Sequence, residues 1–223
     1  MEYELIRSER KTVEIKVGLD GKVTVRAPIR ESKKYIDEFV LSKTQWIEAA
    51  QEKMRKRLDE RKKTDLSKVR FLGKEYQSVS REDAKKVKFD GKRFIFPQNR
   101  TEDERKKLLT AWYKKESRRI FEQRLEHLSE ATGTSYTKLR ISGARTRWGS
   151  CTSEGVISLS WKLIMAEGRA IDYVILHELA HTIEMNHSDD FWSIVEGWMP
   201  AYKDIKKYLQ DFSFAISAEG WNS

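Results

Sequence analysis

The segment His177-Glu178-Leu179-Ala180-His181 constrains this chain more than any other feature. Two histidines four residues apart on a helix lie on one face, so both imidazoles can reach the same metal ion. Glu178 follows the first histidine, near enough to a metal-bound water to take its proton without filling a ligand position. The pattern predicts a zinc site with hydrolytic chemistry, in which His177 and His181 bind Zn²⁺ and Glu178 is the catalytic residue.

The residues around this pattern are strongly apolar, and they favour a buried helix over residues 170–186. Ile171, Val174, Ile175 and Leu179 recur at helical spacing. Burying imidazoles and a carboxylate costs free energy unless something satisfies them, and a metal ion would do so. The alternative, a pair of hydrogen-bonded core histidines, is the weaker interpretation.

A catalytic zinc ion needs a third protein ligand, and His187 is the expected one. It lies six residues after His181, the spacing of H-E-x-x-H-x-x-G-x-x-H sites. Glu184 occupies the glycine position of that pattern, so the turn must form differently, and a left-handed Asn186 is expected to make it. A carboxylate is the alternative third ligand, either Glu196 on the following helix or Glu184 itself.

The remaining histidine and the single cysteine are expected to have no direct role in this site. His127 falls on a long helix and is predicted to be inert on its surface. Cys151 is expected to be a small buried thiol, although a fourth metal ligand is the alternative. One cysteine also excludes an internal disulfide.

The order of elements predicts an α+β fold with two domains, residues 1–98 and 99–223. The first half contains two strand pairs, 13–17 with 23–27 about Asp20-Gly21 and 87–89 with 94–96, and a strand region at 69–79. A helix capped by Ser32 ends before residue 65. The second half contains strands at 139–141 and 156–159 and helices at 101–131, 170–186, 201–209 and from 188 onward. Thr101 and Glu104 form a capping box at the first of these helices.

The positive charge is concentrated in the first half. The net charge is +9, and residues 1–100 carry 27 Lys and Arg against 17 Asp and Glu. The densest stretch, residues 53–63, suits an anionic partner such as nucleic acid or nucleotide, while a solvated helix face is the alternative. No apolar run approaches the roughly 20 residues that span a bilayer, and the first residues lack a secretory signal pattern. A cytoplasmic protein without membrane contact is therefore expected.

Two motifs together resemble a known family. Residues 145–151 read R-T-R-W-G-S-C, and residues 177–187 follow H-E-L-x-H-x5-H. This combination resembles the YgjP-like metallopeptidase family, akin to the SprT-like and WLM zincins, and the resemblance covers nearly the whole chain. It implies a zincin-like second domain, with the active-site helix against a small mixed sheet. It also implies His177, His181 and His187 as ligands and Glu178 as the catalytic residue.

The resemblance leaves two substrate classes open. A peptide is the first, because a strand from segment 139–151, near Ile141, is expected to pair with an extended substrate backbone. A nucleotide is the second, since a pyrophosphatase activity on UTP is also attached to this group. Arg145 and Arg147 are the candidate substrate-binding residues, through a bidentate grip on phosphate or support of an oxyanion. Solvent-exposed arginines are the plain alternative.

Overall fold

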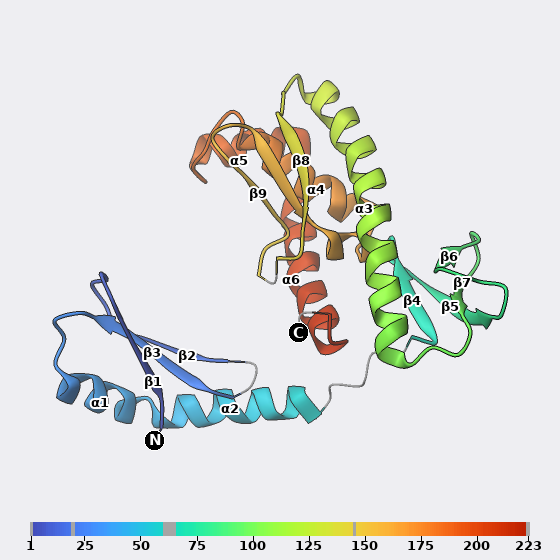
Figure 1. The fold of residues 1–223 in the computed structure, drawn as a ribbon. Coiled ribbons are helices and arrows are strands. Elements are labelled where there is room, and N and C mark those ends of the chain that lie inside the picture. The colour runs from blue at the N-terminus through green and yellow to red at the C-terminus, as the bar shows by residue number, and fades with distance from the viewer. Residues whose placement is uncertain (1, 19–20, 60–65, 145, 222–223) are drawn as a thin grey trace. The chain divides into compact units, whose positions relative to one another are not determined.

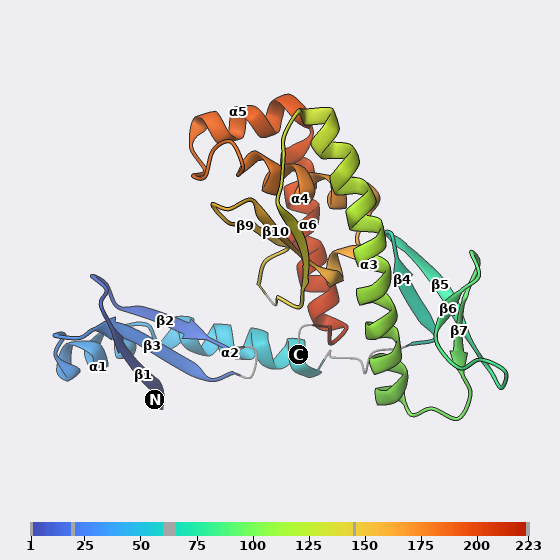
Figure 2. The ribbon, with the colours of Figure 1, turned by 45° about the horizontal axis from the view of Figure 1, so that its top comes forward.

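The computed structural model of the chain describes residues 2–18, 21–59, 66–144 and 146–221 (Figures 1 and 2). Contacts within the chain divide it into two compact units. The first is Met1–Thr64 with Ala218–Gly220, and the second is Asp65–Ser217 with Trp221–Ser223. Among the described residues, six α-helices and a short 3-10 helix accompany three small sheets, each mixing parallel and antiparallel pairs. The predicted α+β class is therefore confirmed.

The first unit is a three-stranded sheet with two helices. The predicted hairpin is confirmed, because β2 pairs antiparallel with β3. A strand that the sequence pattern did not predict, β1, pairs parallel with the other side of β3. The single helix expected after Ser32 is interrupted at Lys43 and forms two helices. The bounds are β1 Glu4–Ser8, β2 Glu14–Val17, β3 Val23–Pro28, α1 Lys33–Ser42 and α2 Thr44–Asp59.

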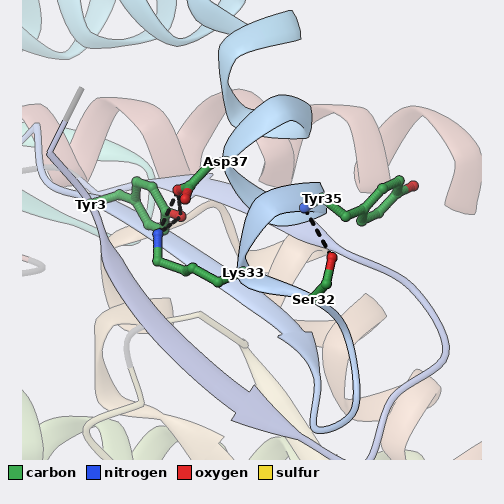
Figure 3. Close-up of polar contacts among 5 residues, drawn as sticks. All are labelled: Tyr3, Ser32, Lys33, Tyr35 and Asp37. Carbon is green, nitrogen blue, oxygen red and sulfur yellow. Dashed lines mark hydrogen bonds and ion pairs between the residues drawn. The ribbon is translucent and has the colours of Figure 1, made fainter.

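Polar contacts fix the start of α1 (Figure 3). The Ser32 hydroxyl accepts a hydrogen bond from the Tyr35 amide at 3.1 Å, which confirms the predicted helix cap. The Asp37 carboxylate accepts from both the Tyr3 hydroxyl and the Lys33 ammonium group. These contacts join the segment before β1 to α1. Beneath them lies a small apolar core of Val23, Val25, Ala27, Ile36, Val40 and Ile47.

The side chains of the basic stretch 53–63 lie outside the residues that the structure describes. The anionic partner expected there remains a prediction. None of the helices in the described ranges has the length and apolar character that crossing a bilayer requires.

The second unit begins with a four-stranded sheet of order β4-β5-β7-β6. The turn between β4 and β5 places Leu72 and Gly73 at φ values of +49° and +79°. Their amide groups donate to the carbonyls of Ile164 and Met165, at 2.9 and 3.2 Å, and so attach the hairpin to the 3-10 turn η1. The bounds are β4 Lys68–Phe71, β5 Lys74–Arg81, β6 Lys88–Phe89, β7 Phe94–Pro97 and η1 Trp161–Met165.

This sheet belongs to the same core as the rest of the second unit, so the division near residue 64 differs from the boundary predicted near 98. Phe71 and Phe94 pack edge-on against Trp112 of the long helix α3, with ring centroids 5.2 and 4.9 Å apart. The neighbouring Tyr113 hydroxyl donates to the Arg70 carbonyl. One continuous cluster of buried apolar side chains leaves no gap at residue 98.

The long helix α3 begins with the predicted capping box, in which Thr101 and Glu104 exchange hydrogen bonds. Figures 1 and 2 show α3 between the β4–β7 sheet and a second sheet of order β8-β10-β9. Helix α4 packs against β9 and β10, as predicted for the active-site helix against a small mixed sheet. The bounds are α3 Glu102–Thr132, β8 Lys138–Ser142, β9 Gly149–Cys151, β10 Val156–Ser160, α4 Gly168–Ala180, α5 Asp189–Trp198 and α6 Tyr202–Ala218.

Candidate metal centre

Helix α4 presents His177 and Glu178 and ends at Ala180, six residues before the expected end, with His181 as its C-terminal cap. The chain turns immediately, because the amides of Ile183 and Glu184 both donate to the Ala180 carbonyl, at 3.0 and 2.9 Å. A helix continued to residue 186 would carry the following residues away from the first two histidines at 1.5 Å per residue. The early end brings residue 187 back toward the helix.

The three histidines His177, His181 and His187 meet in this way, with ring nitrogens that all lie within 4.8 Å of one another. The Nε2 atoms of His177 and His187 are 3.0 Å apart. His181 Nδ1 lies 3.1 Å from the Glu184 carbonyl oxygen, which can only accept, so this nitrogen carries the proton. Its Nε2 is then left with a lone pair, the arrangement by which a metal-binding histidine is oriented.

Glu184, at the position of the pattern's glycine, stabilises the turn through its side chain. Its carboxylate accepts a hydrogen bond from the Asn186 amide at 3.0 Å, while its own carbonyl holds His181. The prediction of a left-handed conformation for Asn186 is wrong. Among the described residues, the non-glycine residues with positive φ are Leu72 and Asn99. The side-chain cap supplies the turn that glycine would otherwise supply.

The alternative carboxylate ligands do not join the histidine cluster. Glu196 lies on α5 and is paired with Lys203 at 3.4 Å, and the Glu184 carboxylate is occupied by the Asn186 amide. Cys151 is a half-buried free thiol on β9, also outside the cluster. His127 is exposed on α3, apart from the site. The structure thus brings together the three histidines that the sequence spacing selected.

The pKa values of two of the imidazoles, His177 and His187, are lowered, which favours the neutral form that binds metals. Burial is the main cause that lowers the pKa of His177 to about 3, and the neighbouring imidazoles lower it further. Burial also lowers the pKa of His187. Aromatic rings surround the cluster, since Phe191 stacks on His181 and Trp192 on His187, at centroid distances of 4.5 and 5.6 Å. Converging imidazoles fit a divalent metal ion, because a metal ion binds the nitrogen lone pair that a proton would otherwise occupy.

Glu178 is buried beside the cluster, with 4% of its surface exposed. Its Oε2 atom has no hydrogen-bond partner, and burial raises the pKa of the carboxyl to about 8, against a smaller opposing effect of Arg147. Gly149 of β9 makes room for this side chain. A Cβ atom there would lie 2.8 Å from Cδ of Glu178 and closer still to Oε1, so a larger residue would displace the carboxylate.

A cavity of about 460 Å³, hereafter the metal cavity, opens onto His177 and Glu178. Arg147 lines it, as the sequence suggested, whereas Arg145 lies outside the described residues. Lys206 of α6 adds a second cation that no sequence signal indicated. The other lining residues are Trp148, Gly149, Tyr173, Val174, Leu209, Gln210 and Ser213.

The strand that contains Ile141, which was expected to hold a peptide, does not line the metal cavity. Ile141 belongs to β8, and β10 lies between β8 and β9. The strand beside Glu178 is β9, which pairs with β10 along one edge only among the described strands. Ile141 is absent from the lining of the metal cavity. The strand of segment 139–151 that lies beside Glu178 is therefore β9 rather than the strand that contains Ile141.

The family model for a YgjP-like metallopeptidase domain matches residues 11–212. The chain belongs to the YgjP-like metallopeptidase family. A search of curated proteins gives no match. Among solved structures, the crystal structure of the metallopeptidase zymogen of Pyrococcus abyssi abylysin is similar, with 27% identity over 41% of this chain and 92% of that chain. Its TM-score is 0.39, so the family assignment rests on the family model alone.

Membership of the YgjP-like family implies a divalent metal ion, and the histidine cluster is compatible with one. Three further residues of this domain were missed by sequence reasoning. Gly149 was part of the recognised motif, but its contact with Glu178 depends on tertiary packing. Lys206 has no local signal, since it is one of several charged residues on an amphipathic helix. Lys162, a buried lysine of η1, did have a local signal in the sequence, because it interrupts the apolar run Trp161-Lys162-Leu163-Ile164-Met165.

Proposed function

We propose that this YgjP-like domain is a zinc-dependent metallopeptidase, with His177, His181 and His187 as the metal ligands and Glu178 as the catalytic base. The observation that carries the proposal is the pairing of two features at the end of helix α4. One ring nitrogen from each of three imidazoles lies within 4.8 Å of the others, and a buried carboxylate oxygen beside them has no hydrogen-bond partner among the described residues. Nitrogen ligands of this kind suit zinc among the divalent metals.

Zinc, when bound, would lower the pKa of a water molecule and polarise a carbonyl group. Glu178 would accept the proton of that water through its unpartnered Oε2 and return it to the leaving amine. Its raised pKa suits both transfers near neutral pH, because the carboxylate readily accepts and then releases a proton. Gly149 holds this carboxylate in place, since its lack of a side chain leaves room for Cδ.

An extended peptide would bind along β9. This strand carries Gly149 next to Glu178, and one of its edges has no partner among the described strands. A peptide backbone that pairs with this edge lies beside the catalytic carboxylate, and such pairing tolerates many side chains. Arg147, at the entrance to β9, lines the cavity and could support the negative charge that develops on the carbonyl oxygen.

The decisive experiment incubates purified, zinc-loaded protein with denatured protein substrates and, in parallel, with a panel of nucleoside triphosphates. The proposal expects peptide-bond cleavage that is lost in Glu178→Gln. Cleavage of UTP without cleavage of any protein would replace the peptidase by a nucleotide pyrophosphatase, for which the cations Arg147 and Lys206 are the supporting observation. Activity that persists in Glu178→Gln would contradict both.

Metal binding is tested separately by titrating zinc into His187→Ala and into the unmodified chain. The proposal expects a large loss of affinity, because the variant keeps only two of three ligands. Unchanged affinity would assign the third ligand to another residue. Glu196→Ala is the matched control, since the pairing of Glu196 with Lys203 places it outside the cluster.

A further inference from the structure

A second cavity, of about 260 Å³, adjoins the metal cavity and is here called the side cavity. The two share Arg147, Trp148 and Ser213 as lining residues, so a ligand in one lies next to the other. The remaining lining of the side cavity is Ala144, Thr146, Ser160, Lys162 and Ile216. Of its lining residues, only Arg147 takes part in the proposed reaction, which leaves the rest of this cavity without an assigned role.

The charge of the side cavity is positive. Lys162 lines it although only 4% of the residue is exposed, and its ammonium group donates to the Ala144 carbonyl at 3.3 Å. Arg147 is the other charged lining residue, and no Asp or Glu is among those described. Two cationic side chains that line one cavity favour a negatively charged occupant, because charge-assisted hydrogen bonds from lysine and arginine are stronger than those between neutral groups.

The side cavity also holds a hydroxyl group with no partner. Ser160 is 1% exposed, and its Oγ atom makes no hydrogen bond within the described structure. The backbone is fixed at this point, because the Ser160 amide donates to the Trp148 carbonyl at 2.8 Å. A hydroxyl donor beside two cations matches the needs of an oxyanion, which accepts several hydrogen bonds at once.

We propose that the side cavity binds a carboxylate group of the peptide substrate, through the cations of Lys162 and Arg147 and the hydroxyl of Ser160. This inference rests on the proposed function and names the class of substrate: peptides with an acidic side chain or a free C-terminus close to the cleaved bond. Lys162, Arg147 and Ser160 carry enough donor groups in this lining for both oxygens of one carboxylate. A triphosphate carries several charges and would need more cations to bind with comparable strength.

Binding is tested without turnover in the zinc-loaded Glu178→Gln protein. Four labelled peptides are variants of one sequence that the unmodified protein cleaves. They combine Glu or Gln at one internal position with a free or an amidated C-terminus. Fluorescence anisotropy is expected to show at least about tenfold tighter binding for one acidic form over its neutral partner, roughly the effect of one charge-assisted contact. Whichever pair shows the preference identifies the side chain or the terminus as the source.

Adding Lys162→Met to this background is expected to bring the ratio of the two affinities close to one, because Met keeps the length of the side chain and removes its charge. Lys207→Met is the matched control and should leave the ratio unchanged. Lys207 is an exposed lysine of α6 that lines neither cavity. If Lys162→Met does not fold, Ser160→Ala takes its place, with a smaller loss of preference expected.

Equal affinities for acidic and neutral peptides would overturn the inference, as would a preference that survives both Lys162→Met and Ser160→Ala. Displacement of the peptides by nucleoside triphosphate, without any acidic preference, would assign the side cavity to phosphate instead. Failure of the proposed function is distinguishable from these results. If the protein is not a peptidase, no cleaved sequence is available and the four peptides are built on an arbitrary sequence. The acidic forms would then still bind more tightly in a way that depends on Lys162, but the unmodified protein would cleave none of them.

Discussion

The metal cavity and the side cavity each contain one buried side-chain oxygen without a hydrogen-bond partner, and the two oxygens differ in what surrounds them. Glu178 Oε2 belongs to the residue that follows His177 of the three-histidine cluster, and Ser160 lines a cavity together with Lys162 and Arg147. These are the unpartnered buried side-chain oxygens among the described residues. Because such atoms are costly, each marks a place where a ligand would complete the structure.

The comparison separates two tasks. In the metal cavity, the unpartnered oxygen belongs to a carboxyl group whose pKa burial raises to about 8, and in the proposed reaction it accepts and returns a proton. In the side cavity, the orphan is a hydroxyl that does not titrate in the working range, and its surroundings are cationic. Changes in the first cavity should therefore alter the rate for every substrate, and changes in the second should alter only the choice among substrates.

The largest effect is expected for Glu178→Gln. Loss of a positioned general base typically lowers kcat by about 10²- to 10⁴-fold, and Gln keeps the size of the side chain. Zinc content measured by atomic absorption should remain unchanged, since Glu178 is not among the clustered nitrogen ligands. A variant that loses zinc together with activity would show that Glu178 supports the metal rather than the proton transfer.

Gly149→Ala should have the next largest effect, because the added Cβ would lie 2.8 Å from Cδ of Glu178 and push the carboxylate away. A displacement of about 1 Å can cost on the order of 10²-fold in rate. Steady-state kinetics with neutral and acidic peptides should show the same loss for both. Gly197→Ala is the matched control, because a Cβ at Gly197 meets nothing within 4 Å. Equal activity of the two variants would mean that Glu178 does not depend on Gly149.

The contrast between the cavities also explains how much the sequence could predict. His177, Glu178 and His181 lie within one helical turn, so their spacing alone places them together. His187 follows across a short turn, and only the way Glu184 makes that turn was missed. The side cavity combines residues from β10, η1, α6 and the segment before β9, and no local pattern relates those segments.

The fold shows the same limit. Helix caps at Ser32 and Thr101 and the hairpin of β2 and β3 are set by neighbouring residues, and the sequence predicted them. The parallel partner β1 and the strand β9 depend on pairing across the chain. The boundary predicted near residue 98 rested on the breaks around Pro97, whereas packing of Phe94 on Trp112 extends the core across it.

A smaller effect is expected for Glu184→Ala, which sharpens the account of the turn. The variant keeps the carbonyl that orients His181 but loses the hydrogen bond to the Asn186 amide. One hydrogen bond contributes about 0.5–1.5 kcal/mol, so zinc affinity should fall by roughly two- to tenfold. Calorimetric titration with zinc measures it. Complete loss of zinc binding would instead make Glu184 a metal ligand.

The smallest effect is expected for Ser160→Ala. This variant tests the side cavity through the free energy of unfolding of the protein. Removing a buried hydroxyl that has no partner should leave the free energy of unfolding unchanged or raise it by up to about 1 kcal/mol. Ser129→Ala is the matched control, because the Ser129 hydroxyl donates to the Thr134 carbonyl at 2.6 Å. Its loss should destabilise the protein by about 0.5–1.5 kcal/mol. Thermal unfolding of both variants without peptide measures the difference. If Ser160→Ala costs as much as Ser129→Ala, the Ser160 hydroxyl already has a partner in the free protein, and the parallel with Glu178 fails.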